Sequence, residues 1–219
     1  RDHRAIPVVA LRLVERARVF VQTEPAHAFQ DYAHGFIGGA LTVVVLDAQD
    51  ELAAMPSGIL NFTIMSFFMG TASYVNTFVA QYHGAQRFHR IGPALWQGMY
   101  VALFGGIFII CMIPLAGPIF SFVGHDPSVQ ENEVVYFQYL CIGGAPVIAS
   151  AALSGFFSGR GKTWPIMWVD MLATAVTIFL DYLLIFGNWG FPEMGMKGAA
   201  IATVISGFIS LFAYVALIA

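Results

Sequence analysis

The run LAAMPSGILNFTIMSFFMGTASYVNTFVAQ, residues 52–81, contains no Asp, Glu, Lys or Arg, and it decides the fold class of this chain. A helix needs about 20 largely apolar residues to cross the hydrocarbon core of a bilayer. The run exceeds that length, so it can span the core with some tilt. It therefore predicts a transmembrane helix rather than an element of a water-soluble core.

The composition of the whole chain agrees with a lipid environment. Of its 219 residues, 58% are hydrophobic and 11% are charged, and the mean hydropathy is +0.73. A soluble domain carries about 25% charged residues. The net charge of −3, without a basic run or a phosphate-binding loop, gives no sign of a nucleic-acid partner. Cys111 and Cys141 lie in apolar segments and are interpreted as small buried hydrophobes, not metal ligands.

Further apolar runs follow the first one along the chain. They cover residues 91–125, 134–158, 164–187 and 198–219, and the run 164–187 is interrupted by two aspartates. We therefore predict an all-α, polytopic membrane helix bundle with five transmembrane helices over residues 51–219.

Residues 1–50 have a different character. They hold five of the ten Lys and Arg residues, and their apolar stretch GFIGGALTVVVL (35–46) is too short to span a bilayer alone. We expect a basic N-terminal segment with a weak or degenerate first helix. A cleaved signal peptide is the weaker alternative, because the basic region is long and also contains acids.

The charges of the loops predict the orientation in the membrane. Loops 82–90 and 158–163 carry two basic residues each, whereas residues 124–133 carry three acids and no Lys or Arg. The positive-inside rule places the two basic loops in the cytoplasm and the acidic loop outside. A multi-pass protein of the plasma (inner) membrane with a cytoplasmic N-terminus and six helices fits this pattern.

Small residues recur every four positions in the last apolar run. One row is Gly198, Ala202 and Ser206, and the neighbouring row is Ala199, Thr203 and Gly207. Small side chains let helix backbones approach closely in membranes. We interpret the rows as helix–helix packing surfaces.

A polar stripe runs along the predicted helix 164–187. At 100° per residue, Asp170 and Asp181 lie on one face, and Thr174 and Thr177 lie between them on the same face. A charged Asp at the centre of a membrane helix costs about 2.5–3.5 kcal/mol on insertion scales. We therefore expect the stripe to face the bundle interior or a water-filled cavity.

The two aspartates of the stripe have different interpretations. Asp170 lies nearer Arg160 and Lys162, so a structural bond to a neighbouring helix or loop is slightly favoured for it. Asp181 has no Lys or Arg close in sequence, and burial favours the neutral form of a carboxyl group. A carboxylate that binds a cation when charged and releases it when neutral is what a proton- or sodium-coupled transporter needs. Thr177, one turn earlier, adds a hydroxyl ligand.

Three strings resemble the multidrug and toxic compound extrusion (MATE) family. They are ELAAMPSGILNFTIMSFFMGTASYVNTFVAQYHGAQ (51–86), GFFSGRGKTWPIM (155–167) and LDYLLIFGNWGFPEMGMKGAAIAT (180–203). The resemblance covers about residues 51–219 and implies a secondary antiporter, not an enzyme, with two lobes of six helices. Such proteins export drug-like or toxic organic compounds in exchange for H⁺ or Na⁺ and use no other cofactor or metal.

The resemblance also implies a cation site in the N-terminal lobe. The aspartate of helix five matches Asp181, the threonine of GAAIAT matches Thr203, and a backbone carbonyl matches Ala199. A polar residue of helix four falls near Ser154, which joins Asp170 and Thr174 as a candidate for the cavity lining.

Two positions depart from the family pattern. The usual Asn four residues before the helix-five aspartate is Thr177, and the helix-one aspartate falls at or near Ala40. A frameshifted or misassembled start and a divergent first helix both explain the second departure. We expect the chain to be a partial sequence whose partner is the second lobe of the same protein.

Two other functions stay open at the level of sequence. A lipid-linked sugar flippase of the same superfamily is the alternative transporter, although the scarcity of Lys and Arg within the spans disfavours it. The second alternative is that the isolated chain is a non-functional fragment of a longer membrane protein.

Overall fold

The computed structural model describes residues 48–123, 125–185, 187, 192 and 194–218. These residues form helices and no strand. The elements are α3 (Ala48–Gly84), η1 (Phe88–Arg90), α4 (Ile91–Cys111), η2 (Ile113–Leu115), α5 (Ala116–Val123), α6 (Pro127–Ser158), α7 (Trp164–Ile185) and α8 (Met196–Ile218). The expected weak first helix and the position of Ala40 lie outside the described residues.

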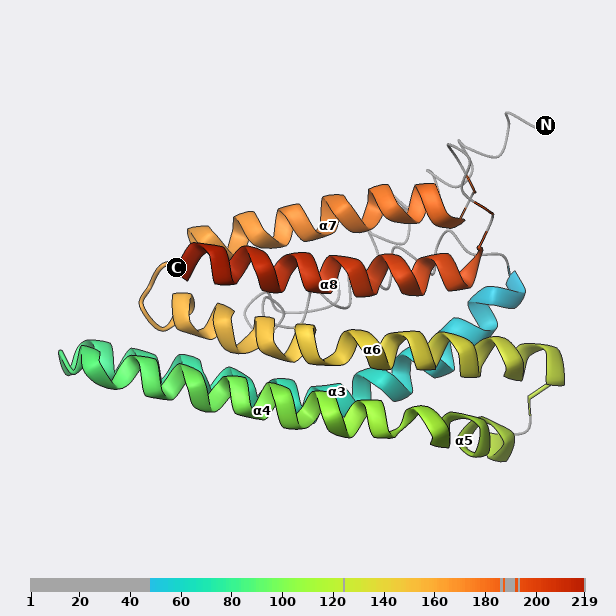
Figure 1. The fold of residues 1–219 in the computed structure, drawn as a ribbon, viewed down its shortest axis with the longest axis horizontal. Helices are drawn as coiled ribbons and strands as arrows, with labels where there is room; N and C mark the ends of the chain where they lie inside the picture. Colours follow the sequence, from blue (N-terminus) through green and yellow to red (C-terminus); the bar gives the residue numbers. More distant parts are fainter. Residues whose placement is uncertain (1–47, 124, 186, 188–191, 193, 219) are drawn as a thin grey trace, which may run out of the picture.

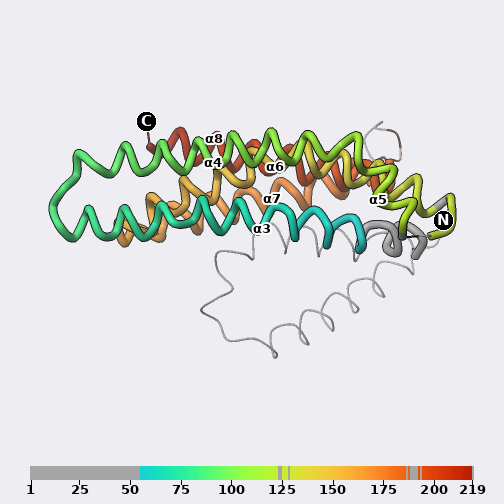
Figure 2. Tube along the Cα trace, turned by 90° about the horizontal axis from the view of Figure 1, so that it is seen from below, coloured from blue at the N-terminus to red at the C-terminus, as the bar shows by residue number. Residues whose placement is uncertain are grey.

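The long helices run side by side along one axis and alternate in direction (Figures 1 and 2). Helix α6 packs against α3, α4 and α8, and α8 packs in turn against α7. In Figure 1, α8 lies between α6 and α7, so it connects α7 to the rest of the bundle. The α3–α4 and α6–α7 connections, which carry the basic loops, lie at the same end as the C-terminus of α8.

Five helical segments of the described chain are long and apolar enough to cross a membrane, which confirms the predicted number. They are Met55–Gly84, Phe88–Phe122, Val129–Gly159, Trp164–Ile185 and Met196–Ile218. Large apolar side chains on their outer surfaces, such as Phe67 (72% exposed), Phe104 (66%) and Phe212 (67%), are suited to contact with lipid.

The run 91–125 does not form one continuous helix. Helix α4 ends at Cys111, and the 3₁₀ turn η2 separates it from the short helix α5. Pro114 lies in this turn, where its missing N–H prevents a regular helical hydrogen bond.

Part of the predicted acidic loop belongs to a helix. Residues 124–133 were expected to form an external loop, but α6 begins at Pro127. Proline suits the first helical position because its N–H is not needed there. As a result Glu133 lies within α6 and is completely buried.

Close approach of the helices depends on small residues. A Cβ added at Gly106 of α4 would lie 2.4 Å from Ala145 Cβ of α6, and one added at Gly198 of α8 would lie 2.8 Å from the carbonyl of Leu184 in α7. Gly198, Ala202 and Gly207 of the two rows in α8 are buried. The interpretation of these rows as packing surfaces is confirmed.

Candidate functional site

The polar stripe of α7 faces the other helices. Thr177 is 4% exposed and Asp181 is 7% exposed, while Asp170 and Thr174 are half-buried. The opposite face of α7 is exposed along its length and includes Met171, Leu172, Ile178, Phe179 and Tyr182. The expected inward orientation of the stripe is confirmed by this division.

Asp170 bonds to the neighbouring helix. The hydroxyl of Tyr214 in α8 donates a hydrogen bond to Asp170 Oδ1 at 3.3 Å. Tyr214 is only 2% exposed, and its ring centroid lies 6.0 Å from that of Phe157 in α6. Asp170 thus takes part in the junction of α6, α7 and α8, in agreement with the structural interpretation.

The Asp170–Tyr214 bond also fixes the level of Asp181. Asp181 follows Asp170 by eleven residues in α7, and Thr203 precedes Tyr214 by eleven residues in the antiparallel helix α8. Eleven residues are three turns plus about 20°, so each pair shares one face of its helix. The same helical geometry therefore brings Thr203 to the level and the face of Asp181.

The close contact between α7 and α8 supports this register. Gly198 packs on Leu184, which lies three residues after Asp181, and Thr203 lies five residues after Gly198. Counted from the Gly198–Leu184 contact, Thr203 is therefore two residues farther along its helix than Asp181 is along its own. Counted from the same contact, Tyr214 is also two residues farther than Asp170. Both contacts therefore place Asp181 beside the first turns of α8.

The surroundings of Asp181 are largely apolar. Ala199 and Ala200 of α8 are fully buried in a cluster with Ile185, Met196 and Tyr136. Tyr136 comes from α6 and lies within electrostatic range of Asp181. A carboxyl group in such an environment interacts strongly with any cation or proton that reaches it, because little water screens the charge.

Two threonines contribute hydroxyl oxygens near this level. Thr177 Oγ1 donates to Ala173 O at 2.9 Å, and Thr203 Oγ1 donates to Ala199 O at 3.0 Å. Each hydroxyl donates its proton to a helix carbonyl, so its oxygen lone pairs are oriented to accept a hydrogen bond or to coordinate a cation. The Ala199 carbonyl, expected as a ligand, accepts the Thr203 hydroxyl in this conformation.

Ser154 is not brought to Asp181. It lies in α6 eighteen residues after Tyr136, which is roughly 27 Å along a helix. Its hydroxyl donates to Ala151 O at 3.0 Å. Ser154 therefore lies toward the Asp170 end of the stripe, and Thr174 lies between the two acids.

Sequence reasoning did not select Tyr136 or Tyr214. The eleven-residue spacing between Thr203 and Tyr214 matches the spacing of the aspartates and was the available signal for Tyr214. Tyr136 had no comparable signal, because its approach to Asp181 depends on how α6 packs. Within the described residues, no group of three or more His, Cys, Asp and Glu side chains could hold a metal ion.

A second buried carboxylate lies on α6, one turn before Tyr136. Glu133 is fully buried, and its Oε1 lies 2.7 Å from Nδ1 of His125, whose side chain is 39% exposed. Ser57 of α3 donates to the backbone carbonyl of Glu133 at 3.0 Å. These contacts join the α5–α6 connection, α6 and α3.

A bundle of membrane-spanning helices with a polar stripe on an inward-facing helix surface is typical of integral membrane transport proteins. The MatE family model matches residues 39–183, which is more than half of the chain. The chain therefore belongs to the MatE family, whose multidrug transporters are secondary transporters and not enzymes. The match begins at residue 39, twelve residues before the string 51–86 that carries the first part of the resemblance.

Two bacterial relatives agree with this family. The "Probable multidrug resistance protein NorM" of Synechocystis sp. is 30% identical over 216 residues, covering 96% of this chain and 42% of the relative. The protein of the same description from Thermotoga maritima is 31% identical over 132 residues, covering 60% of this chain and 28% of the relative. The chain thus spans less than half the length of these relatives.

Solved structures share the fold. A MATE transporter in complex with MaD3S superposes with a TM-score of 0.75 at 20% identity, over 86% of this chain and 42% of that one. The outward-facing conformation of a multidrug resistance MATE family transporter of the MOP superfamily gives 0.74 at 21% identity, over 86% and 41%. Both comparisons confirm the helical membrane fold.

Proposed function

We propose that this chain forms the N-terminal lobe of an exporter that couples the efflux of drug-like or toxic organic compounds to the entry of H⁺ or Na⁺. Asp181 is the coupling carboxylate, and the hydroxyl oxygens of Thr177 and Thr203 complete its site. The observation that carries the proposal is the burial of Asp181 on α7 at the level of Thr203 on α8.

The charge distribution supports a cationic substrate class. Between their ends, the described helices carry no Lys or Arg apart from Lys197 in the first turn of α8. Their buried charges are the carboxyl groups of Glu133 and Asp181. Such an interior attracts organic cations and disfavours the anionic headgroup of a lipid-linked sugar.

Alternating access requires a second lobe. Secondary transporters of this kind move one repeat against another around a central site. The solved relatives are more than twice as long as the matched region, so we propose a second lobe as the partner of this one. The basic loops 82–90 and 158–163 are proposed to face the cytoplasm.

The coupling role is tested in inverted membrane vesicles that contain the complete protein. Asp181→Asn is expected to lower ethidium transport driven by a pH or sodium gradient about tenfold or more, because a charged ligand is removed. Separate pH and Na⁺ gradients distinguish the two coupling ions. Asp170→Asn is the matched control on the same stripe and is expected to retain most of the transport. Full gradient-driven transport by Asp181→Asn would contradict the proposal.

A further inference from the structure

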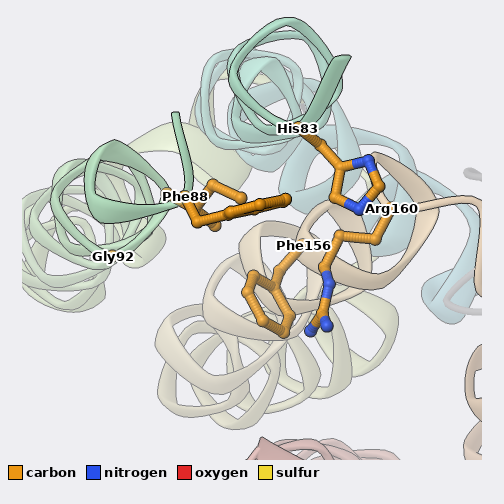
Figure 3. Close-up of a pocket in the computed structure, with 6 residues that line it drawn as sticks. His83, Phe88, Gly92, Phe156 and Arg160 are labelled. Atoms are coloured by element: carbon orange, nitrogen blue, oxygen red, sulfur yellow. The ribbon is translucent and has the colours of Figure 1, made fainter. Parts of the chain in front are cut away.

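A cavity of about 370 Å³ lies at the basic end of the bundle. It is formed where α3 ends, η1 and α4 begin, and α6 ends. Its lining consists of His83, Phe88, Ile91, Gly92, Phe156 and Arg160. Figure 3 shows that the side chains of His83, Phe88, Phe156 and Arg160 gather around one space from these different elements.

Two basic side chains of this cavity pack against aromatic rings. The guanidinium carbon of Arg160 lies 4.9 Å from the centroid of the Phe156 ring. The rings of His83 and Phe88 pack edge to face at 5.5 Å. A guanidinium stacked on a ring keeps its N–H donors at the edge, where they can bind an anion.

The charge around the cavity is uniformly basic. Residues 82–90 and 158–163 contain three arginines, one lysine and two histidines but no Asp or Glu. Among the described residues, the only ion pair joins His125 and Glu133, at the opposite end of α6. Arg160 therefore forms no ion pair with a described acidic side chain.

The cavity lies at the depth of lipid headgroups. Trp96 and Trp164, which are 64% and 68% exposed, lie near the start of α4 and of α7 at this same end. Tryptophan side chains mark the interface between the membrane and water. Most of the lining is apolar, so the site suits a molecule with an anionic group attached to an apolar body. A free inorganic anion would leave that lining unused.

We infer that this cavity binds the headgroup of an anionic phospholipid, with the phosphate at Arg160 and His83 and the glycerol region against Phe88, Ile91 and Phe156. Basic pockets between membrane helices on the cytoplasmic side are suited to such headgroups. Bound there, the lipid would join the ends of α3, α4 and α6. The site is separate from Asp181.

The inference is tested by native mass spectrometry of the complete protein in detergent, titrated with phosphatidylglycerol or with phosphatidylethanolamine of the same acyl chains. The wild type is expected to retain phosphatidylglycerol preferentially. Arg160→Gln is expected to weaken that binding about tenfold, because a charge-assisted hydrogen bond is lost. Lys162→Gln is the matched control: it removes the same charge from the same loop but does not line the cavity.

A second variant separates occupancy of the cavity from charge and folding. Gly92 lines the cavity, is exposed and has open space around it, so Gly92→Leu adds bulk to the lining without a clash and keeps every charge. It is expected to weaken phosphatidylglycerol binding as Arg160→Gln does. Equal effects of Arg160→Gln and Lys162→Gln, no effect of Gly92→Leu, equal retention of the two lipids, or displacement of lipid by millimolar inorganic phosphate would each overturn the inference. The measurement needs no transport, so its failure would leave the role of Asp181 untouched.

Discussion

At the scale of single residues, Asp181 and Thr203 have the clearest chemistry. One supplies a buried carboxyl group, and the other supplies a hydroxyl oxygen whose proton is already donated to Ala199. Their common level follows from the bond between Asp170 and Tyr214. The hydroxyl is therefore expected to act as an acceptor toward whatever cation binds at Asp181.

Thr203→Val keeps the shape of the side chain and removes this oxygen, whereas Thr203→Ser keeps it. We expect the valine variant to need about three- to tenfold more coupling ion for half-maximal transport, since a neutral hydrogen-bonding group contributes about 1 kcal/mol. The serine variant should stay close to the wild type. Titration of the transport rate against Na⁺ and against pH measures both, and identical curves for all three proteins would argue against a hydroxyl ligand.

The pair His125–Glu133 predicts an asymmetric effect on stability. His125→Ala leaves the fully buried Glu133 carboxylate without the imidazole that lies 2.7 Å away, which is expected to destabilise the fold by about 1–3 kcal/mol. Glu133→Gln removes the charge itself and should destabilise less. Thermal unfolding in detergent compares the variants. An unchanged melting temperature for His125→Ala would show that the pair does not stabilise the fold.

The sequence allowed part of the site to be predicted. The face of the stripe followed from helical spacing, because Asp170, Thr174, Thr177 and Asp181 recur with the period of a helix. Burial of Glu133 could not be predicted in the same way. Together with Asp126 and Glu131 it indicated an external loop, but α6 includes Glu133 and packs against α3 at this level.

At the scale of elements, the charge-free runs made it possible to predict where helices occur. The residues at which the helices end could not be predicted in this way. Each charge-free run contains a helix, because lipid requires internally satisfied backbone hydrogen bonds. The break between α4 and α5 lies inside an apolar run, and prolines occur both there and within helices, as Pro56 in α3 and Pro146 in α6 show. Composition alone could not distinguish these cases.

Two glycines with different surroundings, one in the contact between α4 and α6 and one in open space on α3, are expected to respond differently to replacement by alanine. Gly106→Ala places a Cβ 2.4 Å from Ala145 Cβ, and such overpacking is expected to destabilise by about 1–3 kcal/mol. Gly70→Ala in α3 meets no atom within 4 Å and should be neutral or slightly stabilising, because alanine favours helix over glycine. Melting temperatures in detergent test the difference, and equal values would contradict the assigned contact.

At the scale of the whole molecule, the basic loops gather at one end of the bundle and the acidic connection lies at the other (Figure 1). This distribution of charge distinguishes the end proposed to face the cytoplasm from the end proposed to face the outside. It also places the cavity at Arg160 and the pair at Glu133 on opposite surfaces of the lobe.

The proposed orientation is testable with single cysteines in a background where Cys111 and Cys141 are replaced by serine. Ala85→Cys and Asp126→Cys lie at exposed positions at the two ends. In intact cells, a membrane-impermeant maleimide is expected to label Asp126→Cys, and Ala85→Cys only after permeabilisation. The reverse pattern would invert the assigned topology.

The equal spacing of the polar pairs on α7 and α8 has a consequence for sequence change over time. One inserted residue between Asp170 and Asp181 would rotate the second acid by 100° away from Thr203 while the first stayed on Tyr214. An insertion in α8 would do the same from the other side. Insertions and deletions should therefore be rarer within these two segments than in the loops beside them, even where the apolar residues between the pairs exchange freely.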